Sequence, residues 1–115
     1  MNNSLSNHFF QLNEEIQWQN AGAGIQRQVF GYSNNLMLVK VKFEKGAVGA
    51  FHQHPHTQAS YVESGIFELT IGDEKKILKK ADGYFVPPNI VHGCICVEAG
   101  VLIDVFNPLR QDFLK

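Results

Sequence analysis

Turn-forming residues recur along this chain roughly every six to ten positions, and the segments between them are too short for most helices. The segment Leu36–Phe43 shows the pattern clearly, because Val39, Val41 and Phe43 share one face while the lysines between them share the other. Only residues 108–114 have a helical pattern. The spacing therefore predicts an all-β barrel or sandwich of roughly nine to eleven short strands.

The expected strands are bounded by turns rich in glycine, proline and asparagine. They cover Ile25–Tyr32, Leu36–Phe43, Val48–His54, Ala59–Glu63, Ile66–Ile71, Lys75–Leu78, Tyr84–Val86, His92–Val97 and Val101–Phe106. Residues 64–65 and 98–100 are expected to be turns that each separate two strands. Pro108–Leu114 is expected to form a short C-terminal helix of one or two turns, capped by Asn107.

A chain of 115 residues is long enough for one domain with a packed core, since a domain of this size buries roughly two-thirds of its unfolded surface. Residues 1–8 are polar and are expected to be a flexible tail. Residues 9–115 are then the single folded domain.

Charge and hydropathy argue against several classes of partner. The formal net charge is -1 and no run of basic residues occurs, so we expect no nucleic-acid binding. The N-terminus lacks the basic and apolar regions of a signal peptide, and no apolar run approaches the ~20 residues of a membrane span. We expect a cytoplasmic protein, in which Cys94 and Cys96 lie too close on one strand to form a disulfide.

Three of the five histidines lie within residues 51–58. His52 and His54 are two apart, so an extended strand presents both to one ion, and a following bend returns the amide oxygen of Gln58. His92 would arrive from a distant strand behind a Pro-Pro turn. We predict that these four residues hold one divalent transition metal ion, with Zn, Ni, Mn, Fe and Cu all open. His56 is expected outside the ligand set. The alternative for the whole cluster is a solvated histidine loop that binds metal adventitiously.

The same residues lie in two recognisable motifs. The stretch Gly46-x5-His52-x-His54-x3-Gln58-x6-Gly65 resembles the first cupin motif, with glutamine where most cupins carry glutamate. Residues 82–92 are similar to the second cupin motif. The chain departs from that pattern at Ala81 and Asn89, where glycine is common, although asparagine tolerates positive φ better than most residues. The resemblance implies a cupin double-stranded β-helix, or jelly-roll barrel, with the metal in its mouth.

Further segments narrow the resemblance. Leu36–Val39, Phe43–Gly49, His54–Gln58 and Asp104–Phe113 are similar to the small pectin-degradation cupins, and the likeness begins at about residue 9. Members of that family convert 4,5-unsaturated monouronates, left by pectin or alginate lyases, to the linear ketonised 5-keto-4-deoxyuronate. The resemblance implies this metal-dependent reaction for a uronate substrate here, from pectin or from alginate.

The resemblance also assigns roles near the C-terminus. Asp104 corresponds to the acid/base residue, and an apolar strand should raise the pKa of such a carboxyl group. Phe106 and Arg110 correspond to residues that contact the substrate, and Arg110 is also expected among the catalytic residues. The planar guanidinium of Arg110 can pair bidentately with a uronate carboxylate, and Phe106 would form a wall of the pocket. The alternatives are a buried structural aspartate, an ordinary surface arginine and a core phenylalanine.

Other readings stay open at this level. A three-histidine site with iron or copper would also suit a dioxygenase, and a cupin without catalysis could bind a small acid. Tyr61 and Tyr84 are undecided, and Cys94 and Cys96 are expected to be small buried residues rather than metal ligands. A homodimer is expected, because an apolar N-terminal pattern could cover an open sheet edge. That pattern comprises Phe9, Phe10, Leu12 and Trp18.

Overall fold

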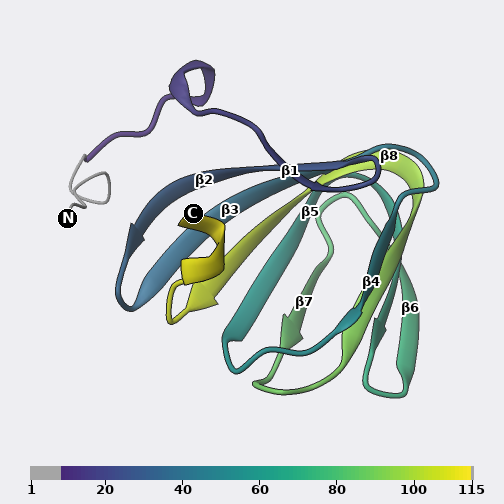
Figure 1. The fold of residues 1–115 in the computed structure, drawn as a ribbon. Helices are drawn as coiled ribbons and strands as arrows, with labels where there is room; N and C mark the ends of the chain where they lie inside the picture. Colours follow the sequence, from purple (N-terminus) through teal and green to yellow (C-terminus); the bar gives the residue numbers. More distant parts are fainter. Residues whose placement is uncertain (1–8, 115) are drawn as a thin grey trace.

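The computed structural model describes residues 9–114, and the predicted tail at residues 1–8 lies outside them. The described chain is almost entirely β-structure (Figure 1). Its elements are η2 (Asn13–Glu15), β1 (Gln19–Gly22), β2 (Ile25–Ser33), β3 (Leu36–Phe43), β4 (Val48–His52), β5 (Thr57–Ile71), β6 (Glu74–Lys79), β7 (Gly83–Val86), β8 (His92–Asn107) and η3 (Gln111–Leu114). The expectation of an all-β fold is confirmed, and the only helices within residues 9–114 are two short 3-10 turns. None of them has the length or hydropathy of a membrane-spanning helix.

Two long strands, β5 and β8, organise the fold because each belongs to both layers of the molecule (Figure 1). The first half of β5 and the second half of β8 join β1, β2, β3 and β7, which we call the first layer. The second half of β5 and the first half of β8 join β4 and β6, which we call the second layer. The β5–β8 ladder runs from Thr57 opposite Asn107 to Ile71 opposite His92, so it links the two layers along its whole length.

The prediction of turns at residues 64–65 and 98–100 is wrong. The chain bends there without reversing, and the β5–β8 register shifts between Val62 and Phe67. Gly65 has φ of +84°, and a Cβ on Gly100 would overlap the carbonyl oxygen of Ser64. The glycines therefore permit a close backbone approach at the bend, which lets one strand pass from one layer to the other.

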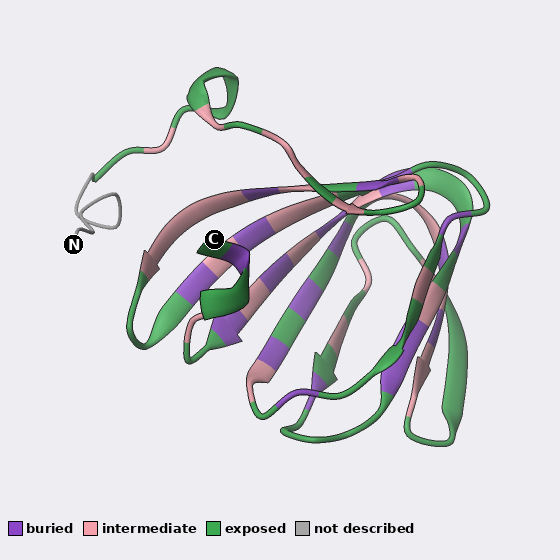
Figure 2. Cartoon of the chain, in the orientation of Figure 1, coloured by how far each residue is buried: buried purple, intermediate pink, exposed green. Residues whose placement is uncertain are grey.

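The core follows the alternation of strand side chains, which is visible as banding along β5 (Figure 2). One cluster fills the space between the layers, where the rings of Phe43 and Phe67 pack edge to face at 5.2 Å. A second cluster of Met37, Val39, Phe106 and Phe113 lies nearer the C-terminus. The inward orientation predicted for Val39, Val41 and Phe43 is confirmed, because apolar side chains at every second position enter the barrel.

The N-terminal segment lies against the outside of the first layer before it enters β1. Buried Gln28 donates through Nε2 to the carbonyl oxygens of Asn13 and Ile16, at 3.1 and 3.0 Å. The segment before η2 leads away from the barrel (Figure 1), and Phe9 and Phe10 are 92% and 83% exposed. Two large apolar side chains are thus without cover from the rest of the described chain.

The C-terminal segment folds back over the first layer. The predicted short C-terminal helical turn is confirmed, but it does not start at Pro108 with Asn107 as its cap, because Asn107 stays paired with Thr57 in the ladder. A cis Asn107–Pro108 peptide follows, and the helical turn η3 begins only at Gln111. The guanidinium of Arg27 lies 3.8 Å from the ring centre of buried Phe113, which holds η3 near the barrel mouth.

Candidate metal centre

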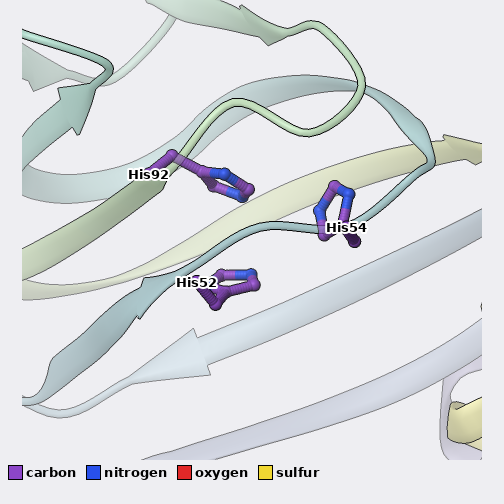
Figure 3. Close-up of side chains that lie close together, drawn as sticks. All are labelled: His52, His54 and His92. Carbon is purple, nitrogen blue, oxygen red and sulfur yellow. The ribbon is translucent and has the colours of Figure 1, made fainter.

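Three histidine side chains from separate parts of the second layer converge at the barrel mouth (Figure 3). His52 ends β4 and His92 begins β8, and the two are directly paired across the antiparallel ladder. Directly opposite residues project to the same side, so their rings lie 4.3 Å apart between centres. His54 enters from the loop after β4, and one nitrogen from each ring lies within 4.8 Å of the others.

Backbone contacts set the orientation of two of these rings. Nδ1 of His52 lies 2.9 Å from the carbonyl oxygen of Ala50, and Nδ1 of His92 lies 2.9 Å from that of Ile90. A carbonyl only accepts, so Nδ1 carries the proton in each ring and donates it. Nε2 is then the unprotonated nitrogen, which is the form that binds a metal ion.

Gln58 completes the predicted ligand set from β5, in the first layer. Its side chain is buried, and Oε1 lies 3.0 Å from Nε2 of His54. Two atoms bound to one ion at about 2.1 Å and at right angles to each other are also about 3.0 Å apart. The donor set is neutral imidazole and amide, which suits transition metals. The four predicted ligands therefore fit one divalent ion.

Burial favours the neutral form of His54 and His92. It lowers the pKa of His54 below 6.5, and the charges of Arg110 and His52 lower it further against the opposing effect of the Gln58 hydrogen bond. Burial is also the main cause of the lowered pKa of His92. A neutral imidazole has a free lone pair, so both shifts favour metal binding.

Ala81 and Asn89, the two departures from the second cupin motif, both lie where the backbone has a positive φ. Ala81 has φ of +78° and Asn89 has φ of +65°, the region that glycine occupies without strain. The amide of Asn89 donates to the carbonyl oxygen of His54 at 2.8 Å. This turn therefore joins the segment before His92 to the loop that carries His54.

A cavity of about 330 Å³ opens beside the histidines and reaches into the barrel. Its lining includes Gln58, Tyr84, Cys94, Asp104, Phe106 and Arg110. A larger hollow of about 760 Å³ lies at the β1–β2 end, away from the histidines. The smaller cavity is the candidate site, because it alone of the two brings ionisable groups to the three-histidine cluster.

Asp104 is buried on β8 and faces this cavity. The hydroxyl of Ser60 donates to its Oδ1 at 2.6 Å. Burial raises the pKa of Asp104 from 3.8 to about 6, although the Ser60 hydrogen bond and the charge of Arg110 favour the ionised form. A carboxyl group with this pKa can both take and return a proton near neutral pH.

Arg110 lies over two aromatic rings at the edge of the cavity. Its guanidinium carbon is 5.1 Å from the ring centre of Phe106 and 4.2 Å from that of Phe113. Asp112 accepts from Nε at 3.1 Å and from Nη2 at 3.0 Å, so the fork is already held by a carboxylate. These contacts fix the guanidinium at the edge of the cavity.

The structure also shows where the residues lie whose roles the sequence left open. His56 stays outside the three-histidine cluster, and its Nε2 lies 3.2 Å from the carbonyl oxygen of Leu109, which links its loop to the segment before Arg110. Tyr61 is half exposed, while Tyr84 lines the cavity. Cys94 is a free thiol there, and burial raises its pKa to about 11, so it is protonated and a poor ligand.

The structure brings all seven predicted site residues to one region, but sequence reasoning missed two of their partners. Ser60 and Asp112 hold Asp104 and Arg110, respectively. Ser60 lies two positions after Gln58 on one strand face, a spacing that could have marked it. The pairing of Asp112 with Arg110 had no comparable signal in the sequence. It depends on the 3-10 turn η3, which the local pattern did not place.

A model of the cupin domain family matches residues 39–106, which include β4, β5, β6 and β7 and every predicted site residue except Arg110. The chain belongs to the cupin family. This cupin is 46% identical over 105 residues to the pectin degradation protein KdgF of Dickeya dadantii, covering 90% of this chain and 96% of that protein. The expected resemblance to the pectin-degradation cupins is confirmed.

Solved structures agree with this assignment. KdgF from Halomonas sp. is 40% identical with a TM-score of 0.88, covering 92% of this cupin and 98% of that chain. An RmlC-like cupin from Shewanella frigidimarina is 42% identical with a TM-score of 0.90, covering 92% and 96%. A Bacillus subtilis oxalate decarboxylase variant, at 18% identity and a TM-score of 0.76, shares the fold alone; the match covers 93% of this cupin and 33% of that chain.

Proposed function

We propose that this cupin converts 4,5-unsaturated monouronates to linear 5-keto-4-deoxyuronate. The observation that carries the proposal is the buried Asp104 carboxyl beside the three-histidine cluster, in a cavity edged by Arg110. The similarity to pectin degradation proteins KdgF supports a substrate from pectin breakdown. A pure binding protein would have no need of a proton-transfer group at this position.

The reaction is an isomerisation, so its atoms balance without an oxidant or a second substrate. The anomeric hydroxyl loses its proton and becomes the aldehyde carbonyl as the bond from C1 to the ring oxygen breaks. The ring oxygen leaves as the enolate of C5, and a proton added at C4 gives the ketone. Asp104 takes the first proton and supplies the second, which a carboxyl group with a pKa of about 6 can do in either direction.

His52, His54, Gln58 and His92 would hold a divalent ion next to this carboxyl group. When bound, such an ion supplies positive charge that lowers the energy of a developing enolate. The ligands are all neutral, so they leave that positive charge uncompensated. The protein's own part is to aim the rings of His52 and His92 through the carbonyl contacts of Ala50 and Ile90, which leave Nε2 as the nitrogen free to bind the ion.

Arg110 would bind the uronate carboxylate in place of, or beside, Asp112. Phe106 packs edge to face on His54, with ring centres 5.8 Å apart, so it forms the wall between the arginine and the histidines. A substrate held by its carboxylate at one end and by the barrel mouth at the other would present C1 and C4 to Asp104.

The test is to mix the metal-supplied protein with 4,5-unsaturated galacturonate and follow the loss of its enol-ether ultraviolet absorbance, with the product identified by NMR. A second arm uses the unsaturated monouronate from alginate, which differs from the pectin-derived one at C2, because elimination removes the stereocentres at C4 and C5. We expect turnover above the spontaneous rate with at least one substrate. A rate equal to the spontaneous one with all of them would refute the proposed function.

We also propose that the protein is a cytoplasmic homodimer. The support for a dimer is the exposure of Phe9 and Phe10 on a segment that leaves the barrel. Trp18 is half-buried and lies under the ammonium of Lys42, 4.3 Å from its ring centre, so it is less available than these two rings. Two large exposed apolar rings on an extended segment are typical of contacts between subunits.

A further inference from the structure

Ser60 joins a predicted metal ligand to the predicted acid/base residue. It lies on β5, two positions after Gln58 and directly opposite Asp104 on β8. Nε2 of Gln58 lies 3.0 Å from its hydroxyl oxygen, and that hydroxyl lies 2.6 Å from Oδ1 of Asp104. All three side chains are buried, so water does not replace these contacts without rearrangement.

The number of protons fixes the direction of both hydrogen bonds. An ionised carboxylate only accepts, so the single hydroxyl proton of Ser60 goes to Asp104. The hydroxyl oxygen then accepts from the amide of Gln58, which places the amide nitrogen toward Ser60. The amide oxygen consequently faces Nε2 of His54, which is the side of the histidine cluster. A rotated amide would present N–H groups there, and these cannot bind a cation.

We propose that Ser60 is a positioning residue with two tasks, which are to keep the Gln58 amide oxygen toward the metal and to hold Oδ1 of Asp104. The second task leaves Oδ2 as the oxygen that moves the proton, and this part rests on the proposed function. The first task rests only on the ligand geometry. Ser60 itself touches neither the metal nor the substrate.

The first task is tested by a cycle of four proteins: wild type, Ser60→Ala, Gln58→Glu and the double variant. Both oxygens of a glutamate can bind a cation, so a carboxylate at this position needs no partner to choose its orientation. We expect Ser60→Ala to weaken Zn²⁺ binding by roughly 10- to 100-fold when residue 58 is glutamine. In the Gln58→Glu background the same change should cost less than about threefold.

Zn²⁺ affinity is measured by calorimetric titration of metal-free protein at one pH, so no uronate is involved. Equal losses in the two backgrounds, or no loss in the glutamine protein, would overturn the orientation task. Circular dichroism and urea unfolding verify that each variant folds, and Ser64→Ala is the matched control. Ser64 lies on the same strand and does not line the cavity beside the histidines, so Zn²⁺ binding should stay at the wild-type value.

The second task is read from kinetics at saturating Zn²⁺. Ser60→Ala should lower kcat by at least about tenfold and leave KM nearly unchanged, because Arg110 is untouched. Ser60→Thr, which keeps the hydroxyl, should recover most of kcat. A change in KM alone, with kcat equal to that of the wild type, would overturn this task. If even the wild type does not turn over the uronate, the proposed function fails, while the Zn²⁺ cycle still decides the first task.

Discussion

The buried carboxyl group of Asp104 should make the stability of the metal-free protein fall as pH rises. Its pKa is 3.8 in an exposed chain and about 6 in the folded protein, a difference of roughly two pH units. Each unit corresponds to about 1.4 kcal/mol, so ionisation in the folded state costs about 3 kcal/mol. Between these two values the folded state binds more protons than the unfolded state. The stabilisation is therefore complete below about pH 4 and lost by about pH 7.

Asp104→Asn isolates this contribution, because asparagine cannot ionise and still accepts the hydrogen bond from Ser60. The free energy of unfolding of the variant, minus that of the wild type, should rise by about 3 kcal/mol from pH 4 to pH 7. His54 and His92 act in the opposite sense, since their lowered pKa values reduce stability as pH falls. They are present in both proteins, so the subtraction removes most of their effect.

The measurement is urea unfolding by far-ultraviolet circular dichroism, in chelator, at several pH values. Metal must be absent, because a nearby cation would favour the ionised carboxylate. Asp73→Asn is the control, since Asp73 is exposed in the turn between β5 and β6. A difference between Asp104→Asn and wild type that is constant within about 0.5 kcal/mol over this range would refute the claimed cost of burial.

Three further predictions concern the site and the assembly. His92→Ala removes one of the clustered imidazoles and should weaken Zn²⁺ binding by more than about a hundredfold in calorimetric titration; an unchanged affinity would place the metal elsewhere. Arg110→Lys keeps the charge but loses the fork, so KM for the uronate should rise by roughly tenfold with kcat little changed, and a KM equal to wild type would remove Arg110 from binding. The double change Phe9→Ser and Phe10→Ser should give a monomer by light scattering with a stability within about 0.5 kcal/mol; a dimer that persists would show that these rings are not its interface.

Local sequence patterns predicted the strands well where a turn reverses the chain. They failed at residues 64–65 and 98–100, where the same glycines bend a strand instead. Glycine is favoured wherever φ is positive or two backbones approach closely, and it is equally favoured in a turn that reverses the chain. Only the pairing partner, which is distant in sequence, distinguishes the two outcomes. The merged strands β5 and β8 could not have been predicted from spacing alone.

The candidate site divides in a similar way. The sequence was sufficient to predict three of the ligands, His52, His54 and Gln58. Their close spacing indicates directly that a strand and a following bend bring them together. His92 was predicted as a fourth ligand from its position after a Pro-Pro turn, although no local spacing connects it to that segment. The acid/base role of Asp104 needed the family resemblance. The contacts of Ser60 and Asp112 needed the structure, because a serine or aspartate in isolation is far more often an ordinary polar residue.

The sharing of β5 and β8 between the layers has a mechanical consequence. His52 and His92 belong to the second layer, whereas Gln58 belongs to the first. One ion bound by all three would therefore connect the two layers at the open end of the sandwich. The opposite end is already closed by the bends near Gly65 and Gly100. Removing the ion should therefore loosen the molecule unevenly, with faster amide exchange at β4 and the start of β8 than at the bends. The mouth that admits the substrate would then be the part of the barrel whose rigidity depends on the metal.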